Sequence, residues 1–197
     1  MSSRRVFVAI NTMQKHESAF TLIELMITIA VAAVVLTLGV PSFSSVIERN
    51  QLSAYTNQLV SSLHFARSEA VRRNQPIKVC HSNNATDCNG TGYENGWIIF
   101  VDDDDDGSLG STEELIRVNE GLPANYTFNV NGNLDEFAFN SKGISTNQGR
   151  FVLCKNNTLS SSRAIFIGPA GRTRLAPLDD NGIPEASPNT PITTCNP

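Results

Sequence analysis

The feature that most restricts the fold of this chain is an apolar run near its N-terminus, Phe20 to Val40, in which Glu24 is the one charged residue. A helix of these 21 residues would be about 31 Å long, enough to cross the hydrocarbon core of a bilayer. The run is too long for a secretory signal peptide, whose apolar part has about 7 to 15 residues. Because basic residues precede the run, we expect residues 20–40 to form a transmembrane helix and the rest of the chain to lie outside the cytoplasm.

The residues after this run predict that the helix continues. Apolar residues recur every three or four positions, which is typical of a single buried stripe on a helix. The stripe consists of Leu52, Tyr55, Leu59, Leu63, Ala66 and Ala70. Polar residues fill the other face, namely Asn57, Gln58, Ser61, Ser62, Glu69 and Arg73. Since a proline disfavours helix in the residue before it, Asn74-Gln75-Pro76 ends the helix, and residues 41–73 form its amphipathic part.

Residues 74–197 predict a globular, β-rich domain, because short β-prone runs alternate with Gly, Asn, Asp and Pro. The expected strands are Ile77–Cys80, Gly96–Val101, Leu115–Asn119, Tyr126–Val130, Glu136–Asn140, Arg150–Cys154, Arg163–Ile167 and Arg172–Leu175. A mainly antiparallel sheet, or a pair of sheets, packed against the long helix would give an α+β fold.

The chain has four cysteines, Cys80, Cys88, Cys154 and Cys195, in the part expected outside the cytoplasm. Disulfides are the usual state of cysteines there, and four cysteines allow three pairings. We favour Cys80–Cys88, which closes a short loop, and Cys154–Cys195, which fixes the C-terminal tail. Zinc binding by Cys80, His81 and Cys88 is the alternative, although this spacing matches no familiar zinc site.

Charge is distributed unevenly along the chain. Residues 74–136 contain twelve acidic and two basic residues, whereas residues 137–178 contain six basic residues and no acidic one. The basic stretch includes Gly171-Arg172-Thr173-Arg174. Because alternate residues of a strand share a side, Arg172 and Arg174 are expected to present two guanidinium groups together, a geometry that suits adjacent phosphates.

This pattern suggests the hypothesis that the basic residues bind the phosphate backbone of DNA. They would make no contacts that distinguish the bases. The predicted residues of this site are Gly171, Arg172 and Arg174, helped by Arg150, Lys155 and Arg163. The alternative is that the arginines pair with the acidic residues 102–106 or with neighbouring subunits.

Five consecutive aspartates followed by Gly107 match the start of a twelve-residue calcium loop. The ligands of such a site would be Asp102, Asp104, Asp106 and Glu113. The flanking residues read as strands, whereas an EF-hand requires helices. An exposed acidic hairpin loop is therefore the preferred interpretation, with calcium as the alternative and no cofactor required.

Catalysis has the least support. The three histidines are His16, His64 and His81, and no nucleophile elbow, phosphate-binding loop or zinc-protease motif is present. We expect His64 to be packed or solvated on the helix. The sequence therefore predicts a protein that is not an enzyme.

Ala19 followed by Phe-Thr-Leu-Ile-Glu and an unbroken apolar helix resembles the type III signal of type IV pilins and pseudopilins. The resemblance implies that prepilin peptidase removes residues 1–19, that Phe20 becomes N-methylated, and that Glu24 pairs with the N-terminal amine of a neighbouring subunit. Pro41 lies where this family often has a helix-kinking proline. Ala19 departs from the usual Gly before the cut, and translation from Met13 would give a more typical seven-residue leader.

Two internal segments narrow the resemblance. The run from Phe65 to Asn74 and the run from Asn95 to Asp102 are similar to segments of the GspH/FimT family of minor pilins and pseudopilins. The resemblance implies a type IV pilin fold and contacts with other pilins through the N-terminal helix. In the FimT branch a GRxR motif is associated with DNA binding during natural transformation, and residues 171–174 match it.

The function expected from the sequence is that of a minor type IV pilin that binds double-stranded DNA non-specifically and supports DNA uptake. Its helix would lie in the bacterial inner membrane and its globular domain in the periplasm before it joins a pilus or pseudopilus. The alternatives are a structural type II secretion pseudopilin of the GspH kind and a pilus-priming minor pilin without DNA binding.

Overall fold

The computed structural model of this protein describes residues 20–131 and 136–196, without the side chains of residues 38–42. Helix α1 (Leu22–Arg73) opens the described part and continues through Pro41. The chain divides into two units, Met1–Ser44 and Ser45–Pro197. Among the described residues, no helix combines the length and the apolar character of a membrane span. The transmembrane helix expected over residues 20–40 therefore stays a prediction.

The part of α1 that belongs to the second unit buries the apolar stripe expected from the sequence. Leu52, Leu59 and Leu63 are almost completely buried, as are Ala66 and Ala70, and Tyr55 packs against them. Ser62 and Glu69, which were expected on the polar face of the helix, are also buried. Each has polar partners that make burial possible: the Ser62 hydroxyl donates to the Gln58 carbonyl, and Glu69 accepts from two arginines.

The end of α1 is fixed by backbone geometry and by charge. Asn74 adopts the left-handed conformation with φ of 56°, and the Gln75 N–H donates to the Ala70 carbonyl, which is the Schellman closure of a helix. Arg73 contacts Glu69 at 2.7 Å and Glu114 at 2.6 Å. Hydrogen bonds from Arg72 and Arg73 hold the pKa of Glu69 at about 2. The last turn of the helix is thereby tied to the segment that enters β3.

Within residues 20–131 and 136–196, the strands form two four-stranded antiparallel sheets and one short pair. The first sheet has the order β3-β2-β1-β5, the second β4-β6-β7-β8, and β9 pairs with β10. The bounds are β1 (Ile77–His81), β2 (Gly96–Val101), β3 (Leu115–Glu120), β4 (Tyr126–Val130), β5 (Glu136–Phe139), β6 (Gly149–Lys155), β7 (Thr158–Ile167), β8 (Thr173–Leu175), β9 (Glu185–Ser187) and β10 (Thr190–Pro191). These strands and α1 confirm the predicted α+β fold.

All eight predicted strands are present, with small differences in their bounds. β7 begins at Thr158, five residues before its expected start, and β8 begins at Thr173, so that Arg172 precedes the strand. The short helix η1 (Tyr93–Asn95) and strands β9 and β10 were not predicted. Each of these unpredicted elements has two or three residues, too few to show a periodic pattern.

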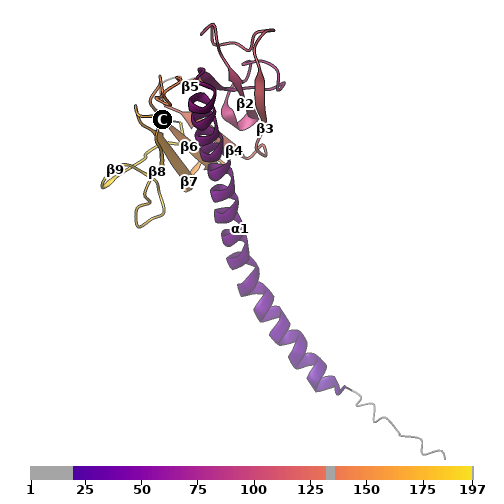
Figure 1. The fold of residues 1–197 in the computed structure, drawn as a ribbon. Coiled ribbons are helices and arrows are strands. Elements are labelled where there is room, and N and C mark those ends of the chain that lie inside the picture. The colour runs from indigo at the N-terminus through magenta and orange to yellow at the C-terminus, as the bar shows by residue number, and fades with distance from the viewer. Residues whose placement is uncertain (1–19, 132–135, 197) are drawn as a thin grey trace, which may run out of the picture. The chain divides into compact units, whose positions relative to one another are not determined.

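One core joins the stripe of α1 to the inner faces of both sheets. In Figure 1, β2 and β3 lie to the right of this part of α1, and β6, β7 and β8 lie to its left. Aromatic side chains fill the space between the elements, with Tyr93, Phe128 and Phe137 all within 6.3 Å, centroid to centroid, of the Phe151 ring. This core holds the two sheets on one helix.

A disulfide-linked segment covers part of the outer face of each sheet. Cys80 and Cys88 are bonded, with Cα atoms 5.5 Å apart, beside Ile98 and Phe100. Cys154 and Cys195 are bonded, with Cα atoms 6.0 Å apart, and hold the C-terminal tail on the second sheet. These are the two pairings favoured from the sequence. The zinc alternative is wrong, because sulfur atoms bonded to each other are not thiolate ligands.

Candidate functional site

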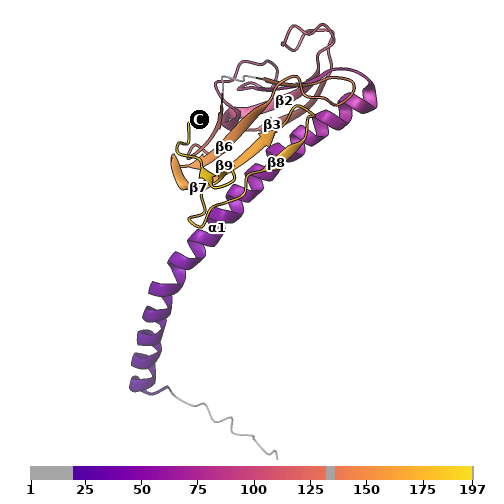
Figure 2. The same ribbon diagram turned by 90° about the vertical axis from the view of Figure 1, so that its left-hand side faces the viewer.

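The second sheet places three arginines on its outer face. Arg150 of β6 lies opposite Phe166 of β7, and Phe166 lies opposite Arg174 of β8. Residues directly opposite each other in an antiparallel sheet share a face. Their neighbours Ile165 and Ile167 are buried in the main core, so the arginines point away from it. The order of the strands in this sheet is β4-β6-β7-β8, and Figure 2 labels β6, β7 and β8 from a second side.

Arg172 joins this row through the hairpin that connects β7 and β8. The Gly168 N–H donates to the Arg172 carbonyl at 3.0 Å, so the strand pairing extends to Arg172. Because Arg172 precedes Arg174 by two positions, it lies on the same face. We call Arg150, Arg172 and Arg174 the outer-face arginines. Arg172 and Arg174 are exposed, and Arg150 is half-buried.

The guanidinium groups of this row have few partners within the protein. Arg174 lies over the Phe166 ring, 4.4 Å from its centroid. The Nε atom of Arg150 is buried and has no hydrogen-bond partner among the described residues. None of the outer-face arginines forms an ion pair with a described residue, so within this part of the chain they do not pair with the acidic residues 102–106.

Gly171 shapes the hairpin that carries Arg172 and Arg174. Its N–H donates to the Gly168 carbonyl at 2.9 Å, and its φ is 68°. This is a three-residue hairpin loop that ends in a left-handed residue, a position that favours glycine. A Cβ at residue 171 would lie 2.5 Å from the Gly143 carbonyl oxygen, which accepts a hydrogen bond from Arg67 Nε at 2.9 Å. Gly171 therefore has a packing role and does not itself supply a charge.

Arg163 and Lys155 lie on the opposite face of the same sheet, which corrects the grouping expected from the sequence. Arg163 of β7 lies opposite Leu153, a residue of the main core, and Lys155 follows Leu153 by two positions. Lys155 Nζ contacts Glu48 at 2.9 Å, and this contact raises the pKa of Lys155. The two-residue period of a strand sends these side chains toward α1 and away from the outer-face arginines.

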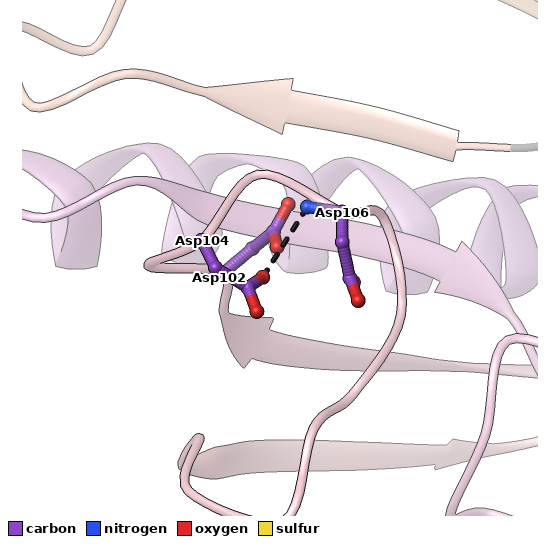
Figure 3. Close-up of side chains that lie close together, drawn as sticks. All are labelled: Asp102, Asp104 and Asp106. Atoms are coloured by element: carbon purple, nitrogen blue, oxygen red, sulfur yellow. Dashed lines mark hydrogen bonds between the residues drawn. The ribbon is translucent and has the colours of Figure 1, made fainter.

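The acidic loop brings together three of the four expected calcium ligands. Oxygen atoms of Asp102, Asp104 and Asp106 lie within 4.8 Å of one another (Figure 3). Glu113 does not join them, because its carboxylate accepts the N–H groups of Asp103 and Gly110, each at 2.8 Å. Glu113 thus fixes the loop backbone and is not the fourth ligand.

A buried lysine already neutralises part of this cluster. Lys78 Nζ lies 2.6 Å from Asp102 and 3.3 Å from Glu136, and both Lys78 and Asp102 are almost completely buried. Burial lowers the pKa of Lys78, but contact with Asp102 and the charge of Glu136 outweigh burial and raise it overall. The ammonium group takes the position of a counter-ion beside Asp102.

We expect calcium to stabilise this protein only slightly. Three carboxylates with an ammonium group beside one of them offer less than the full ligand set of a calcium loop. Millimolar calcium should raise the Tm by less than about 2 °C, measured by scanning calorimetry with and without chelator. A rise above about 5 °C that disappears in Asp104→Ala would instead establish a calcium site.

The residues of the expected processing and assembly sites are only partly described. Ala19 lies outside the described residues, and Phe20 is exposed. Glu24 stands in the first turn of α1, where its N–H donates to the Thr21 hydroxyl at 3.3 Å. A pairing of Glu24 with the amine of another subunit stays a prediction.

Sequence reasoning did not find two residues of these sites. Nothing in the sequence pattern marks Phe166 as a site residue, because its role depends on the strand register that places it between Arg150 and Arg174. Lys78 had a weak signal, since it is a charge within the apolar run of β1. Its partners Asp102 and Glu136 come from β-strand ends far away in the sequence.

Comparison with known protein families decides the class of this chain. Residues 55–171 match the family described as type II transport protein GspH, and residues 14–40 match the prokaryotic N-terminal methylation motif. The chain belongs to the GspH family. It is therefore a non-enzymatic minor pilin or pseudopilin of a type IV pilus or a type II secretion system. Members of this class are cut by prepilin peptidase, are anchored in the inner membrane and then assemble with other pilins.

The fold is shared with a solved minor pilin. Two crystal forms of the type IV minor pilin FimU of Pseudomonas aeruginosa align with TM-scores of 0.57 and 0.52, at 24% and 22% identity. The alignments cover 75% and 73% of this chain and 97% and 99% of FimU. The minor pseudopilin EpsH of the Vibrio cholerae type 2 secretion system aligns with a TM-score of 0.45 at 11% identity, over 63% of this chain and 94% of EpsH. No curated protein matches the chain.

Proposed function

We propose that this member of the GspH family is a FimT-like minor type IV pilin that binds double-stranded DNA through the outer-face arginines and supports DNA uptake in natural transformation. The observation that carries the proposal is the register of β6, β7 and β8, which gathers Arg150 and Arg174 on one face and extends the row to Arg172. None of the three has an ion-pair partner among the described residues.

The chemistry of the row suits phosphates and not bases. A guanidinium group donates from its edge, and a phosphate accepts two parallel hydrogen bonds from it. Contact with the Phe166 ring covers one face of the Arg174 guanidinium and leaves its edge available. Contacts of this kind do not distinguish sequences. A Kd of about 10⁻⁴ to 10⁻⁶ M is therefore expected at physiological salt, and several subunits would share the binding.

The test is a titration of the full-length protein in detergent with a labelled DNA duplex at several salt concentrations. Three phosphate contacts predict that binding weakens about 40-fold between 50 and 200 mM salt. In Arg172→Ala/Arg174→Ala, one contact remains, so binding should be weak at low salt and fall only about fourfold over the same range. The matched control is Lys155→Gln/Arg163→Gln, which removes two charges from the opposite face and should bind like the wild type.

Two outcomes would contradict the proposal. One is the absence of DNA binding at low salt, which would leave a structural subunit of a pilus or of a type II secretion pseudopilus. The other is an equal loss of binding in both double variants, which would mean that net charge and not the outer face attracts DNA.

A further inference from the structure

A cavity on the other side of the second sheet holds two arginines that the DNA proposal does not use. The cavity has a volume of about 490 Å³ and lies between α1, the first half of β7 and the loop of residues 178–182. Arg49 enters it from α1 and Arg163 from β7, with Ser160 and Ser161 beside them. All of these residues belong to the unit that begins at Ser45.

The positive charge in this cavity lacks a counter-ion. Among the described residues, no carboxylate lies within ion-pair distance of Arg49 or Arg163. Arg163 is half-buried and donates from Nη1 to the Ser162 carbonyl at 2.8 Å. Burial, together with the charge of Arg49, lowers the pKa of Arg163. A half-buried guanidinium beside a like charge is unfavourable until an anion enters.

The carboxylates that line the cavity are occupied or face solvent. Glu48 is bound by Lys155 at 2.9 Å. Asp179 accepts the N–H groups of Asn181 at 2.9 Å and Ile183 at 2.7 Å, and these bonds hold the turn of the loop. Asp180 is exposed. None of these carboxylates therefore neutralises Arg49 or Arg163. The cavity can accept an anion from outside the chain between the two arginines.

The surroundings select the kind of anion. Asp179 and Asp180 on the loop side would repel a polyanion such as a DNA strand more strongly than a single carboxylate, which carries one negative charge. Next to the cavity on α1, Val46 and Ile47 are 54% and 55% exposed. A partner that offers both an apolar helix face and an acidic side chain would cover these residues and supply the missing charge.

We propose that this cavity is a carboxylate-binding site that receives an Asp or Glu side chain from a neighbouring pilin subunit between Arg49 and Arg163. The proposal rests on membership of the GspH family, which assembles with other pilins, and not on DNA binding. It assigns Arg163 to subunit contact, on the face opposite the outer-face arginines.

The test uses the full-length protein in detergent micelles with isotope-labelled arginine, and N-acetylglutamate amide as the probe. At low salt the probe should shift the Nε–Hε NMR signal of Arg163 saturably, with a Kd on the order of 10 mM. N-acetylglutamine amide, which has the same shape without the charge, should leave the signal in place. Arg49→Gln should weaken binding of the glutamate probe at least about tenfold. Arg163→Lys should weaken it by a similar factor, because lysine keeps the charge but lacks the paired N–H donors of a guanidinium group. In that variant, binding is measured from the NMR signal of Arg49.

Three results would overturn the assignment. The first is an Arg163 signal that does not respond to the glutamate probe. The second is an equal response to the glutamine probe. The third is tighter binding of inorganic phosphate than of the glutamate probe, which would make the cavity a phosphate site. Because the outer-face arginines take no part, each result can be separated from the outcome of the DNA titration.

Discussion

Replacing Lys78 by methionine is expected to lower the free energy of unfolding by about 3 to 5 kcal/mol. The ammonium group lies 2.6 Å from Asp102 and 3.3 Å from Glu136, and Lys78 and Asp102 are almost completely buried. Without Lys78, the Asp102 carboxylate stays buried with no opposite charge beside it. Denaturant unfolding monitored by Trp97 fluorescence, together with a fall in Tm of about 10 °C, would measure the loss.

The control for this prediction removes both charges. Lys78→Met/Asp102→Leu replaces the pair by apolar side chains, which is often neutral or stabilising. The double variant should therefore recover most of the stability that Lys78→Met loses. If Lys78→Met cost less than about 1 kcal/mol, the ion pair would have to be solvated, and the account of the acidic loop would be wrong.

Gly171→Ala is expected to lower the free energy of unfolding by about 3 kcal/mol. Its φ of 68° would cost alanine about 1 to 2 kcal/mol, and the new Cβ would meet the Gly143 carbonyl oxygen at 2.5 Å. Relief of this contact requires movement of the backbone, which adds a cost typical of overpacking, about 1 to 3 kcal/mol. Because the turn carries Arg172 and Arg174, DNA binding should weaken in the same variant although no charge is lost.

Gly182→Ala is the matched control for Gly171→Ala. Gly182 has a similar φ of 77°, but a Cβ there would have nothing within 4 Å. Alanine at residue 182 should therefore cost only about 1 kcal/mol and leave DNA binding unchanged. Equal losses of stability in the two variants would show that the approach of Gly171 to Gly143 has no energetic consequence.

The regular parts of the fold were predictable because their sequence patterns are local. The stripe from Leu52 to Ala70 follows the helical period, and the strand of residues 96–101 is bounded by Gly96 and the aspartates after Val101. The buried positions of Ser62 and Glu69 were not predictable. The hydrogen bonds that Ser62 and Glu69 make along α1 are local, but their burial depends on distant segments of the chain. The Ser62 hydroxyl lies 3.3 Å from Asn119 Oδ1 of β3, and Arg73, which binds Glu69, is held by Glu114 at 2.6 Å.

The candidate site was predictable in part for the same reason. Arg172 and Arg174 are neighbours in the sequence, so their common face follows from the strand period alone. The register of β6 with β7 decides on which face each of the other arginines lies. It places Arg150 on the outer face and Arg163 on the opposite face. Composition counts all six basic residues of residues 137–178 equally. In the structure Lys142 lies in a turn, and the second sheet divides the other five between its two faces.

Binding of DNA to the outer-face arginines is tested by comparing Arg150→Gln with Arg163→Gln in the full-length protein. Each substitution removes one positive charge from adjacent strands of one sheet, but Arg150 faces outward and Arg163 faces α1. Arg150→Gln is expected to reduce the slope of log Kd against log salt by about 0.9, whereas Arg163→Gln should leave the slope unchanged. Equal reductions in the two variants, or a reduction in Arg163→Gln alone, would contradict DNA binding by the outer-face arginines.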